Sequence, residues 1–259
     1  MTHTTLEDHL RHLSDAVPVD RLAEVVGTVA FEVGRGRSLE RHVLAFDRGD
    51  VAYLSDAPVD DEVDVLLQAD ESTLLHLVTG KANAGLEYLG GTLEILGDTE
   101  LALAVGGLFG VDPRALDPVD VASALGGVKK EHLRKVMSSG FRAVVLGEIF
   151  GRFPDFVNEQ KARDVDLAIG FRLLGSPSGD VERYVVRLDH GTCTVTEGDS
   201  GGERLAVDAT ITCEAHDFLR LVTGHLNAVA GVLRGQLKVK GDKVKALALA
   251  GAMDIPQPR

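Results

Sequence analysis

Leu77-Val-Thr-Gly80 and Leu221-Val-Thr-Gly224 are two copies of one tetrapeptide, 144 positions apart in a chain of 259 residues. The same spacing continues without a gap, bringing Asn83 onto Asn227, Gly91 onto Gly235, and Gly97-Asp98 onto Gly241-Asp242. Nearer the start the spacing becomes 140, which pairs Phe31 with Phe171. Longer loops in the second copy, around 176–179 and 198–202, account for the difference. A register this long predicts a tandem duplication.

Both copies are predicted to contain the same succession of elements. The first copy has an amphipathic helix over 6–17, a strand through Phe31, a hairpin of 43–46 and 51–54, a strand at 63–68, short helices near 74–78 and 83–89, and a strand at 92–96. The second copy has matching segments at 146–153, Phe171, 184–188 with 192–195, 207–213, 218–222, 227–233 and 236–240. Strands with interleaved short helices indicate an α+β fold with helices on one face of a sheet.

The duplication divides the chain into three parts. We expect a first module over residues 1–110, a helical insert over 111–140 and a second module over 141–259. In the insert, Asp117-Pro118 is typical of a helix start. Residues 128–137 are basic, a charge that could mark a contact with a partner or a membrane, and a solvated helix face is the interpretation that we favour.

Composition excludes several classes of function. Forty acidic residues against 27 basic ones give a net charge of −13, which argues against a nucleic-acid partner and leaves only transient membrane contact. The two cysteines, Cys193 and Cys213, form neither a disulfide framework nor a thiolate metal site. Because the chain also lacks a signal peptide and an apolar run long enough to span a bilayer, we expect a cytoplasmic protein.

The repeated motifs resemble the sterol carrier protein type two family. The residues that carry the resemblance are Val207-Asp208, the stretch from Phe218 to Asn227 with its Thr-Gly, and Arg234-Gly-Gln-Leu-Lys-Val-Lys-Gly-Asp242. The first copy resembles the family more weakly, through 77–83 and 91–98. The resemblance implies a mixed five-stranded sheet covered by helices, with an apolar tunnel for a sterol, fatty acid or acyl-CoA. It also implies lipid binding or transfer without a cofactor, rather than catalysis.

Aliphatic and aromatic residues of the strands and short helices are the candidate lining of such a tunnel. In the first copy the candidate ligand-binding residues are Phe31, Phe46, Tyr53, Leu74, Val78, Leu86, Tyr88 and Leu89. In the second copy they are Phe171, Val186, Phe218, Val222, Leu226, Val229, Val232 and Leu233.

Two alternatives to a lipid carrier stay open. An enzyme could use one cavity for a hydrophobic metabolite, with Glu87, Tyr88, Tyr53 and His76 as the groups to test, although Glu87 is expected to face solvent. A scaffold protein could have kept the fold while its cavities collapsed. The sequence contains no HExxH, GxSxG or phosphate-binding loop, so no catalytic residue and no metal ligand is assigned.

A comparison of the two final strands predicts an interface. Lys240 and Lys245 of the second copy stand where the first copy has Leu96 and Leu101. An outer face that is charged in one copy and apolar in the other indicates burial. We therefore expect Leu96 and Leu101 to contact the other repeat, the insert or another subunit.

Overall fold

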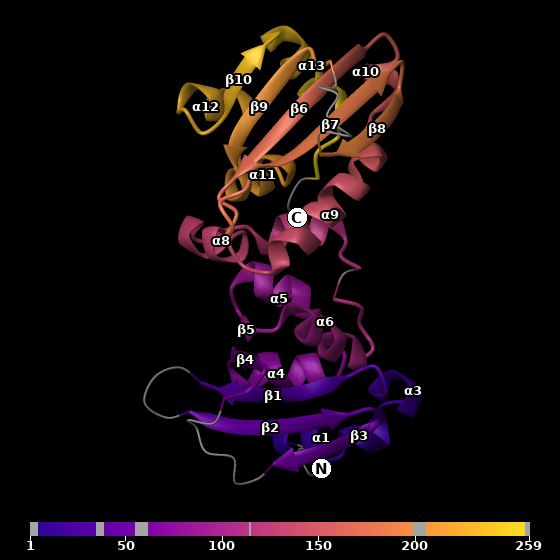
Figure 1. The fold of residues 1–259 in the computed structure, drawn as a ribbon, viewed down its shortest axis with the longest axis vertical. Coiled ribbons are helices and arrows are strands. Elements are labelled where there is room, and N and C mark those ends of the chain that lie inside the picture. Colours follow the sequence, from indigo (N-terminus) through magenta and orange to yellow (C-terminus); the bar gives the residue numbers. More distant parts are fainter. Residues whose placement is uncertain (1–4, 35–38, 55–61, 114, 199–205, 257–259) are drawn as a thin grey trace. The chain divides into compact units, whose positions relative to one another are not determined.

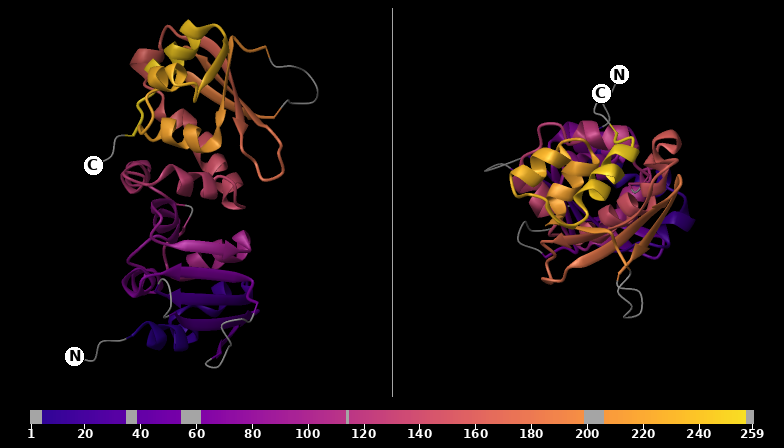
Figure 2. Two further views of the ribbon diagram at one scale, coloured as in Figure 1. Left: turned by 90° about the vertical axis from the view of Figure 1, so that its left-hand side faces the viewer. Right: turned by 90° about the horizontal axis from the view of Figure 1, so that it is seen from above.

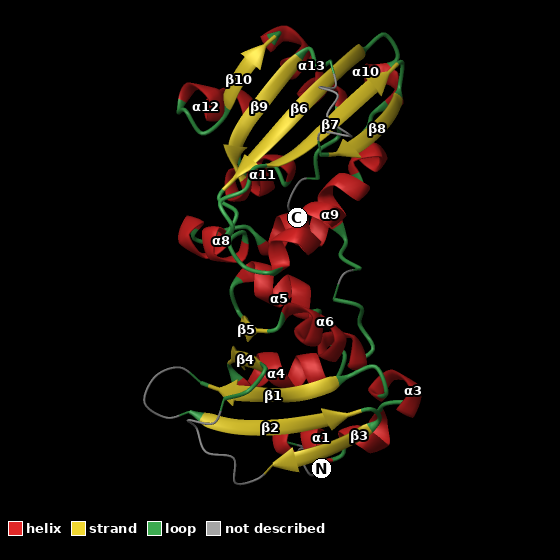
Figure 3. Cartoon of the chain, viewed as in Figure 1, coloured by secondary structure: helices red, strands yellow, loops and turns green. Residues whose placement is uncertain are grey.

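The computed structural model describes residues 5–34, 39–54, 62–113, 115–198 and 206–256 (Figure 1). The chain divides into two compact units, residues 1–117 and residues 118–259. Each unit contains one five-stranded sheet with helices, as Figure 3 shows. The α+β class expected from the sequence is therefore present in both halves.

The first sheet has the strand order β3-β2-β1-β4-β5. Its strands are β1 (Val26–Val33), β2 (Glu40–Asp47), β3 (Asp50–Leu54), β4 (Val65–Ala69) and β5 (Glu94–Gly97). β1 pairs antiparallel with β2 and parallel with β4, so the sheet is mixed. Arg48 and Gly49 join β2 to β3 with positive φ angles, which is the geometry of a two-residue hairpin turn.

The second sheet has the equivalent order, β8-β7-β6-β9-β10. Its strands are β6 (Asp166–Leu174), β7 (Glu182–Asp189), β8 (Thr192–Glu197), β9 (Ala209–Glu214) and β10 (Lys238–Gly241). Phe31 lies opposite Leu67 in the first sheet, and Phe171 lies opposite Ile211 in the second. These partners are 140 and 144 positions apart, so the spacings of the sequence repeat are also the register of strand pairing.

Short helices cover the sheets. The first unit contains α1 (Leu6–Arg11), α2 (Leu13–Ala16), α3 (Val19–Leu22), α4 (Glu71–Val78), α5 (Ala84–Gly90) and α6 (Thr99–Leu108). The second contains α7 (Pro118–Ala124), α8 (Lys130–Val136), α9 (Phe141–Gly151), the 3₁₀ helix η1 (Phe153–Phe156), α10 (Glu159–Ala162), α11 (Ala215–Val222), α12 (Ala228–Leu233) and α13 (Lys243–Ala252). In the second unit α11, α12 and α13 lie together on one side of the sheet (Figure 2).

The residues repeated in the sequence fix the helix ends. The side chain of Asn83 accepts hydrogen bonds from the backbone N–H groups of Gly85 and Leu86 in the first turn of α5, and the side chain of Asn227 accepts one from the N–H of Ala230 in α12. Asp98 and Asp242 likewise cap α6 and α13. Gly80, which follows α4, has a φ of +67° and ends the helix in the left-handed conformation.

Among the helices that were not predicted from the sequence, the two longest follow the last strand of each sheet. α6 and α13 follow the Gly-Asp turns, where only a final strand and a turn were expected. Their sequences are rich in Ala, Leu and Gly with few polar positions, so the periodicity that indicates an amphipathic helix is weak. Part of the loop at 198–202, expected to be longer in the second copy, lies outside the described residues. Among the described helices, none is long and apolar enough to cross a membrane.

Candidate functional site

The inner face of the first sheet comes from the alternation of side chains along β2. His42, Leu44 and Phe46 are buried on this face, and Phe31 of β1 lies opposite His42 in the pairing register. α1 packs against β2 and β3, and α4 packs against β1 and β4. The face is therefore apolar apart from the imidazole of His42, the hydroxyl of Tyr53 and, at its end, the carboxyl group of Glu40.

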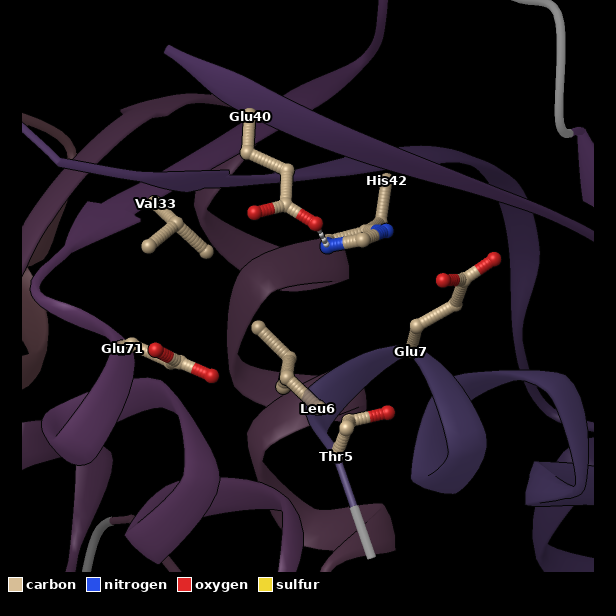
Figure 4. Close-up of a pocket in the computed structure, with 7 residues that line it drawn as sticks. All are labelled: Thr5, Leu6, Glu7, Val33, Glu40, His42 and Glu71. Atoms are coloured by element: carbon tan, nitrogen blue, oxygen red, sulfur yellow. Dashed lines mark ion pairs between the residues drawn. The ribbon is translucent and has the colours of Figure 1, made fainter. Parts of the chain in front are cut away.

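A pocket of about 130 Å³ opens at the end of this face (Figure 4). The pocket is lined by Thr5, Leu6, Glu7, Val33, Glu40, His42 and Glu71. Cavities that bind drug-sized ligands measure about 300–1,000 Å³. The pocket therefore has room for a small polar group and is too small to enclose a sterol or a long acyl chain.

His42 is the centre of the polar groups in this pocket. Its side chain is buried, and its Nδ1 forms a hydrogen bond of 2.7 Å with the hydroxyl of Tyr53 on β3. Its Nε2 lies 3.4 Å from Oε1 of Glu40, an ion pair when the imidazole is protonated. The guanidinium of Arg11 lies over the Tyr53 ring at 4.1 Å. Burial, and next the charge of Glu7, raise the pKa of Tyr53, so this phenol stays protonated at neutral pH.

The charge of the pocket limits what it can hold. Glu7, Glu40 and Glu71 place three carboxyl groups around it, and Arg11 pairs with Glu7 at 2.6 Å. Such a lining favours a neutral or cationic group and repels an anion. In the part of the chain that the structure describes, no group of three His, Cys, Asp or Glu side chains is placed to hold a metal ion.

The candidate ligand residues of the first module divide by burial. Phe31, Phe46, Leu74, Tyr88 and Leu89 are buried. Tyr53, Val78 and Leu86 are half-buried. Phe31 makes an edge-to-face contact with Phe109, with 6.4 Å between the ring centres. The half-buried residues Val78 on α4 and Leu86 on α5 are therefore the aliphatic candidates with accessible surface.

In the second module the candidate aromatic residues pack against one another. Phe171 and Phe218 belong to a cluster with Phe150, Phe153 and Tyr184. The ring of Phe150 stacks on Tyr184 at 3.7 Å and on Phe218 at 5.1 Å between centres. Burial raises the pKa of Tyr184 to about 12. Aromatic rings therefore fill the space between this sheet and α9 and α11, where Val186 and Leu226 are also buried.

The candidates on α12 lie on its outer face rather than between helix and sheet. Val229, Val232 and Leu233 are exposed, and Leu233 is 83% exposed. Gly231 forms the inner face, because a Cβ there would lie 2.9 Å from the side chain of Leu237. Val222, at the end of α11, is half-buried. Because α12 approaches Leu237 so closely at Gly231, its larger side chains lie on the side that faces away from the sheet.

The four groups named for catalysis do not form one site with each other. Tyr53 belongs to the His42 pocket, Tyr88 is buried and His76 is exposed. The carboxylate of Glu87 accepts a short hydrogen bond from the hydroxyl of Thr92, just beyond the end of α5. Thr92 also binds the backbone carbonyl of Glu87, so this contact closes the turn after the helix.

Two buried polar clusters of the second module were missed from the sequence. Arg142 of α9 binds the carboxylate of Glu182 and, at 2.8 Å, the carbonyl of Met137. Asp217 of α11 accepts a hydrogen bond from Gln236 at 2.9 Å and lies 3.5 Å from the ammonium group of Lys130. Each cluster joins segments that are far apart in the sequence, and no local pattern marks such pairs.

The two leucines expected at an interface have different surroundings. Leu96 is exposed, whereas the side chain of Leu101 packs over the backbone of Gly27 in the same module. A Cβ at Gly27 would lie 2.7 Å from Leu101. An interface through Leu96 remains a prediction.

Two curated relatives match part of the chain. Sterol carrier protein 2 from Homo sapiens is 27% identical over 112 residues, which cover 43% of this chain and 20% of that protein. Hydroxysteroid dehydrogenase-like protein 2 from Xenopus tropicalis is 28% identical over 104 residues, which cover 40% of this chain and 24% of that protein. The chain thus spans about a fifth to a quarter of the length of these relatives.

Solved structures with low overall scores come from two groups of proteins. Sterol carrier protein 2 like 2 from Aedes aegypti is 16% identical with a TM-score of 0.33, covering 40% of this chain and 92% of that chain. The stereoselective inverting sec-alkylsulfatase Pisa1 from Pseudomonas sp. is 15% identical with a TM-score of 0.37, covering 70% and 31%.

The family models reverse the expected order of resemblance. Residues 6–110 match the model of the SCP-2 sterol transfer family, although the second module was expected to be closer to that family. Residues 142–259 instead match the model described as alkyl sulfatase C-terminal. The repeated Asn, Asp and Gly residues cap helices and shape turns in both modules, so they do not distinguish the two families. Residues 6–110 are thus similar to the SCP-2 sterol transfer family, and residues 142–259 are similar to the alkyl sulfatase C-terminal family.

Proposed function

We propose that the first module binds a hydrophobic molecule between its sheet and the helices α4 and α5. The observation that carries the proposal is the family match over residues 6–110, which includes every strand of the first sheet and runs from α1 to just beyond α6. Val78 and Leu86 offer aliphatic surface there, and burying such surface gains about 25 cal/mol per Å².

The charge of the first module favours a neutral ligand. Residues 1–117 contain 22 acidic and 8 basic residues, and three carboxyl groups line the pocket beside the inner face. A fatty-acid carboxylate or the phosphates of acyl-CoA would be repelled by this potential. Of the three ligand classes expected from the sequence, a sterol therefore fits the module best.

The proposal is tested by displacement of a fluorescent sterol from the full chain. Val78 and Val222 occupy matching positions of α4 and α11, and both are half-buried, so they form a matched pair. We expect Val78→Asp to weaken sterol binding by about tenfold or more, because a carboxylate is costly in an apolar site. Val222→Asp is the control and should leave this binding unchanged.

Native mass spectrometry of protein purified from its own host gives an independent measurement. A bound neutral lipid that is reduced by Val78→Asp is the expected result. A chain that carries no lipid and binds no fluorescent sterol or fatty acid would contradict the proposal.

For the second module we propose a scaffold or interaction role. The observation that favours this role is the stacked cluster of Phe150, Phe171, Tyr184 and Phe218 in the space between sheet and helices.

We also propose that both modules arose by tandem duplication, with boundaries at 110 and 140, and that the protein is cytoplasmic. The shared strand order and the repeat spacing support the duplication.

A further inference from the structure

Exposed aliphatic side chains occur on α12 and α13, the two helices that precede and follow the edge strand β10 in the chain. Val229, Val232 and Leu233 follow the i, i+3, i+4 spacing of one helix face on α12, and all three are exposed. On α13, Val244 is 77% exposed and Leu247 is also exposed, while Ala246 and Leu249 are buried on the other side. Both helices therefore present an apolar surface to their surroundings.

Basic side chains lie between these apolar residues in the chain. β10 is the edge strand that connects α12 to α13 (Figure 1). Lys238 and Lys240 are exposed on this strand, Arg234 is exposed before it and Lys243 is exposed after it. None of these four cations forms an ion pair with a residue that the structure describes. We refer to these four residues with Val229, Val232, Leu233, Val244 and Leu247 as the α12–α13 edge.

At the matching positions the first module has neither the exposed cations nor the exposed aliphatic side chain of Val229. Gly90, Glu94, Leu96 and Thr99 stand where the α12–α13 edge has its four cations. Gly85 stands at the position of Val229, and a Cβ there would lie 2.4 Å from the carbonyl oxygen of Pro113. The first module thus covers this helix with its own chain.

The chain after α13 takes a different path. The N–H of Asp254 donates to the carbonyl of Phe156 at 2.8 Å, and Met253 forms a bridge with Val157. This segment is therefore bound beside η1, while Val229, Val232 and Leu233 remain exposed on α12. The apolar surface of the α12–α13 edge is a property of the second module alone.

The distribution of charge supports an anionic partner. Residues 118–259 contain 18 acidic and 19 basic residues, so the negative charge of the chain resides in the first unit. From 218 to 253 the sequence has six basic residues and one acidic residue, Asp242. Any anionic surface would meet this stretch with little repulsion.

We propose that the α12–α13 edge docks on the surface of an anionic lipid bilayer. The aliphatic side chains enter the boundary between headgroups and acyl chains, and the lysines extend their ammonium groups to the lipid phosphates. Neither signal is strong alone, and their combination is what reversible membrane binding needs. Protein interfaces are enriched in aromatic residues and depleted in lysine, whereas this edge has lysines and no aromatic residue.

Vesicle flotation of the full chain tests the proposal. The probes are vesicles of phosphatidylcholine alone and vesicles with about 30 mol% phosphatidylserine. We expect binding to the anionic vesicles that decreases at high salt. Lys238→Glu with Lys240→Glu should weaken binding by about twentyfold or more, since each lysine near such a surface contributes about fivefold. Val232→Ser with Leu233→Ser should weaken it by about tenfold or more.

Matched controls change charge and hydrophobicity elsewhere. Arg163→Glu with Lys129→Glu produces the same change in net charge at two exposed residues outside the edge, and Leu54→Ser removes an exposed leucine from β3. These controls should bind vesicles as the unmodified chain does. Equal binding to neutral and anionic vesicles, no binding at all, or equal losses in the controls would overturn the proposal.

Sedimentation without lipid tests whether a second copy of the chain, rather than a membrane, covers the α12–α13 edge. If the unmodified chain self-associates and Val232→Ser with Leu233→Ser makes it monomeric, a second copy covers the edge and the proposal fails. The result is separable from cavity binding, because Lys238→Glu with Lys240→Glu should bind the fluorescent sterol as before. Circular dichroism of each variant confirms that its fold is retained.

Discussion

At the scale of single residues, one contact explains why two dipeptides are repeated: Gly97-Asp98 with Val63-Asp64 in the first copy, and Gly241-Asp242 with Val207-Asp208 in the second. The N–H of Asp98 donates to the carbonyl of Asp64 at 2.9 Å, and Asp242 donates to Asp208 at the same distance. Gly97 lies so close that an added Cβ would be 2.0 Å from the carbonyl oxygen of Asp64. The two motifs are therefore halves of one contact between β5 and β4, repeated between β10 and β9.

Gly97→Ala should destabilise the first unit by about 3 kcal/mol or more, because both the clash and the φ of +102° oppose an alanine. Urea unfolding measures the loss. Gly110→Ala is the matched control for backbone conformation, since Gly110 has a φ of +84° and no atom within 4 Å of its added Cβ. This control should cost about 1 kcal/mol. Equal effects of the two changes would show that the close approach to Asp64 has no energetic weight.

Asp64 and Asp208 should make stability dependent on acid. The backbone N–H and hydroxyl of Thr28 hold the pKa of Asp64 below its usual range, and Lys245 and the N–H of Ala168 do so for Asp208. Each carboxylate therefore stabilises the fold at pH values above its pKa in the unfolded chain, which is near 3.8. This stabilisation is lost as the pH falls through the lower pKa of the folded chain. Asp64→Asn should cost about 1 kcal/mol at neutral pH, given the exposure of this group.

The measurement for Asp64 is the free energy of unfolding at about pH 7 and about pH 3. The difference between the unmodified chain and Asp64→Asn should be present at the higher pH and shrink at the lower one. Asp20, an exposed carboxylate on α3, is the control, and the stability of Asp20→Asn relative to the unmodified chain should be the same at both pH values. A constant gap at both pH values would exclude the titration of Asp64 as its cause.

At the scale of elements, the junction of α8 and α11 should respond to pH in the range of histidine. His216 is 3% exposed, and its Nε2 has no hydrogen-bond partner among the described residues. Burial lowers the pKa of His216 below 6.5; Lys130 and Arg134 on α8 lower it further, and Asp217 and Glu214 oppose this. The unfolded chain therefore takes up a proton that the folded chain resists, so stability decreases as the pH falls below 6.5.

His216→Asn should reduce this loss, because the variant has no imidazole to protonate. Unfolding of the second unit at about pH 7 and about pH 5 gives the comparison. His190 is exposed, and its pKa is raised by Asp189, so His190→Asn should not reduce the acid-induced loss. If His216→Asn and the unmodified chain lose the same stability, the buried imidazole does not cause the acid sensitivity.

The sequence predicted the elements that carry strong local signals. Alternation placed the β2–β3 and β7–β8 hairpins, and Asn83 and Asn227 marked the starts of α5 and α12. α6 and α13 were missed because Ala, Leu and Gly occupy most of both helix faces. The outward position of Leu233 could not be predicted either, since Gly231 determines it through a contact with Leu237. The His42–Tyr53 pair joins two strands across a register that periodicity does not specify.

At the scale of the whole molecule, charge separates the two units more clearly than sequence similarity does. Residues 1–117 carry a net charge of −14 and residues 118–259 a net charge of +1. The acidic unit matches the SCP-2 sterol transfer family, and the nearly neutral unit contains the α12–α13 edge. A chain with this distribution can present its second unit to an anionic surface while the first unit is repelled from it.

The same asymmetry predicts that salt stabilises one unit more than the other. Self-repulsion among 22 acidic residues destabilises the compact first unit, and dissolved ions screen it. Each unit has its own sheet and core, so we expect two unfolding transitions, which Gly97→Ala and Gly241→Ala assign by lowering one midpoint each. Raising sodium chloride from about 0.02 M to about 0.5 M should raise the midpoint of the first transition and change the second little. A common shift of both transitions, or a single transition affected by either glycine, would mean that charge and unfolding are shared across the whole chain.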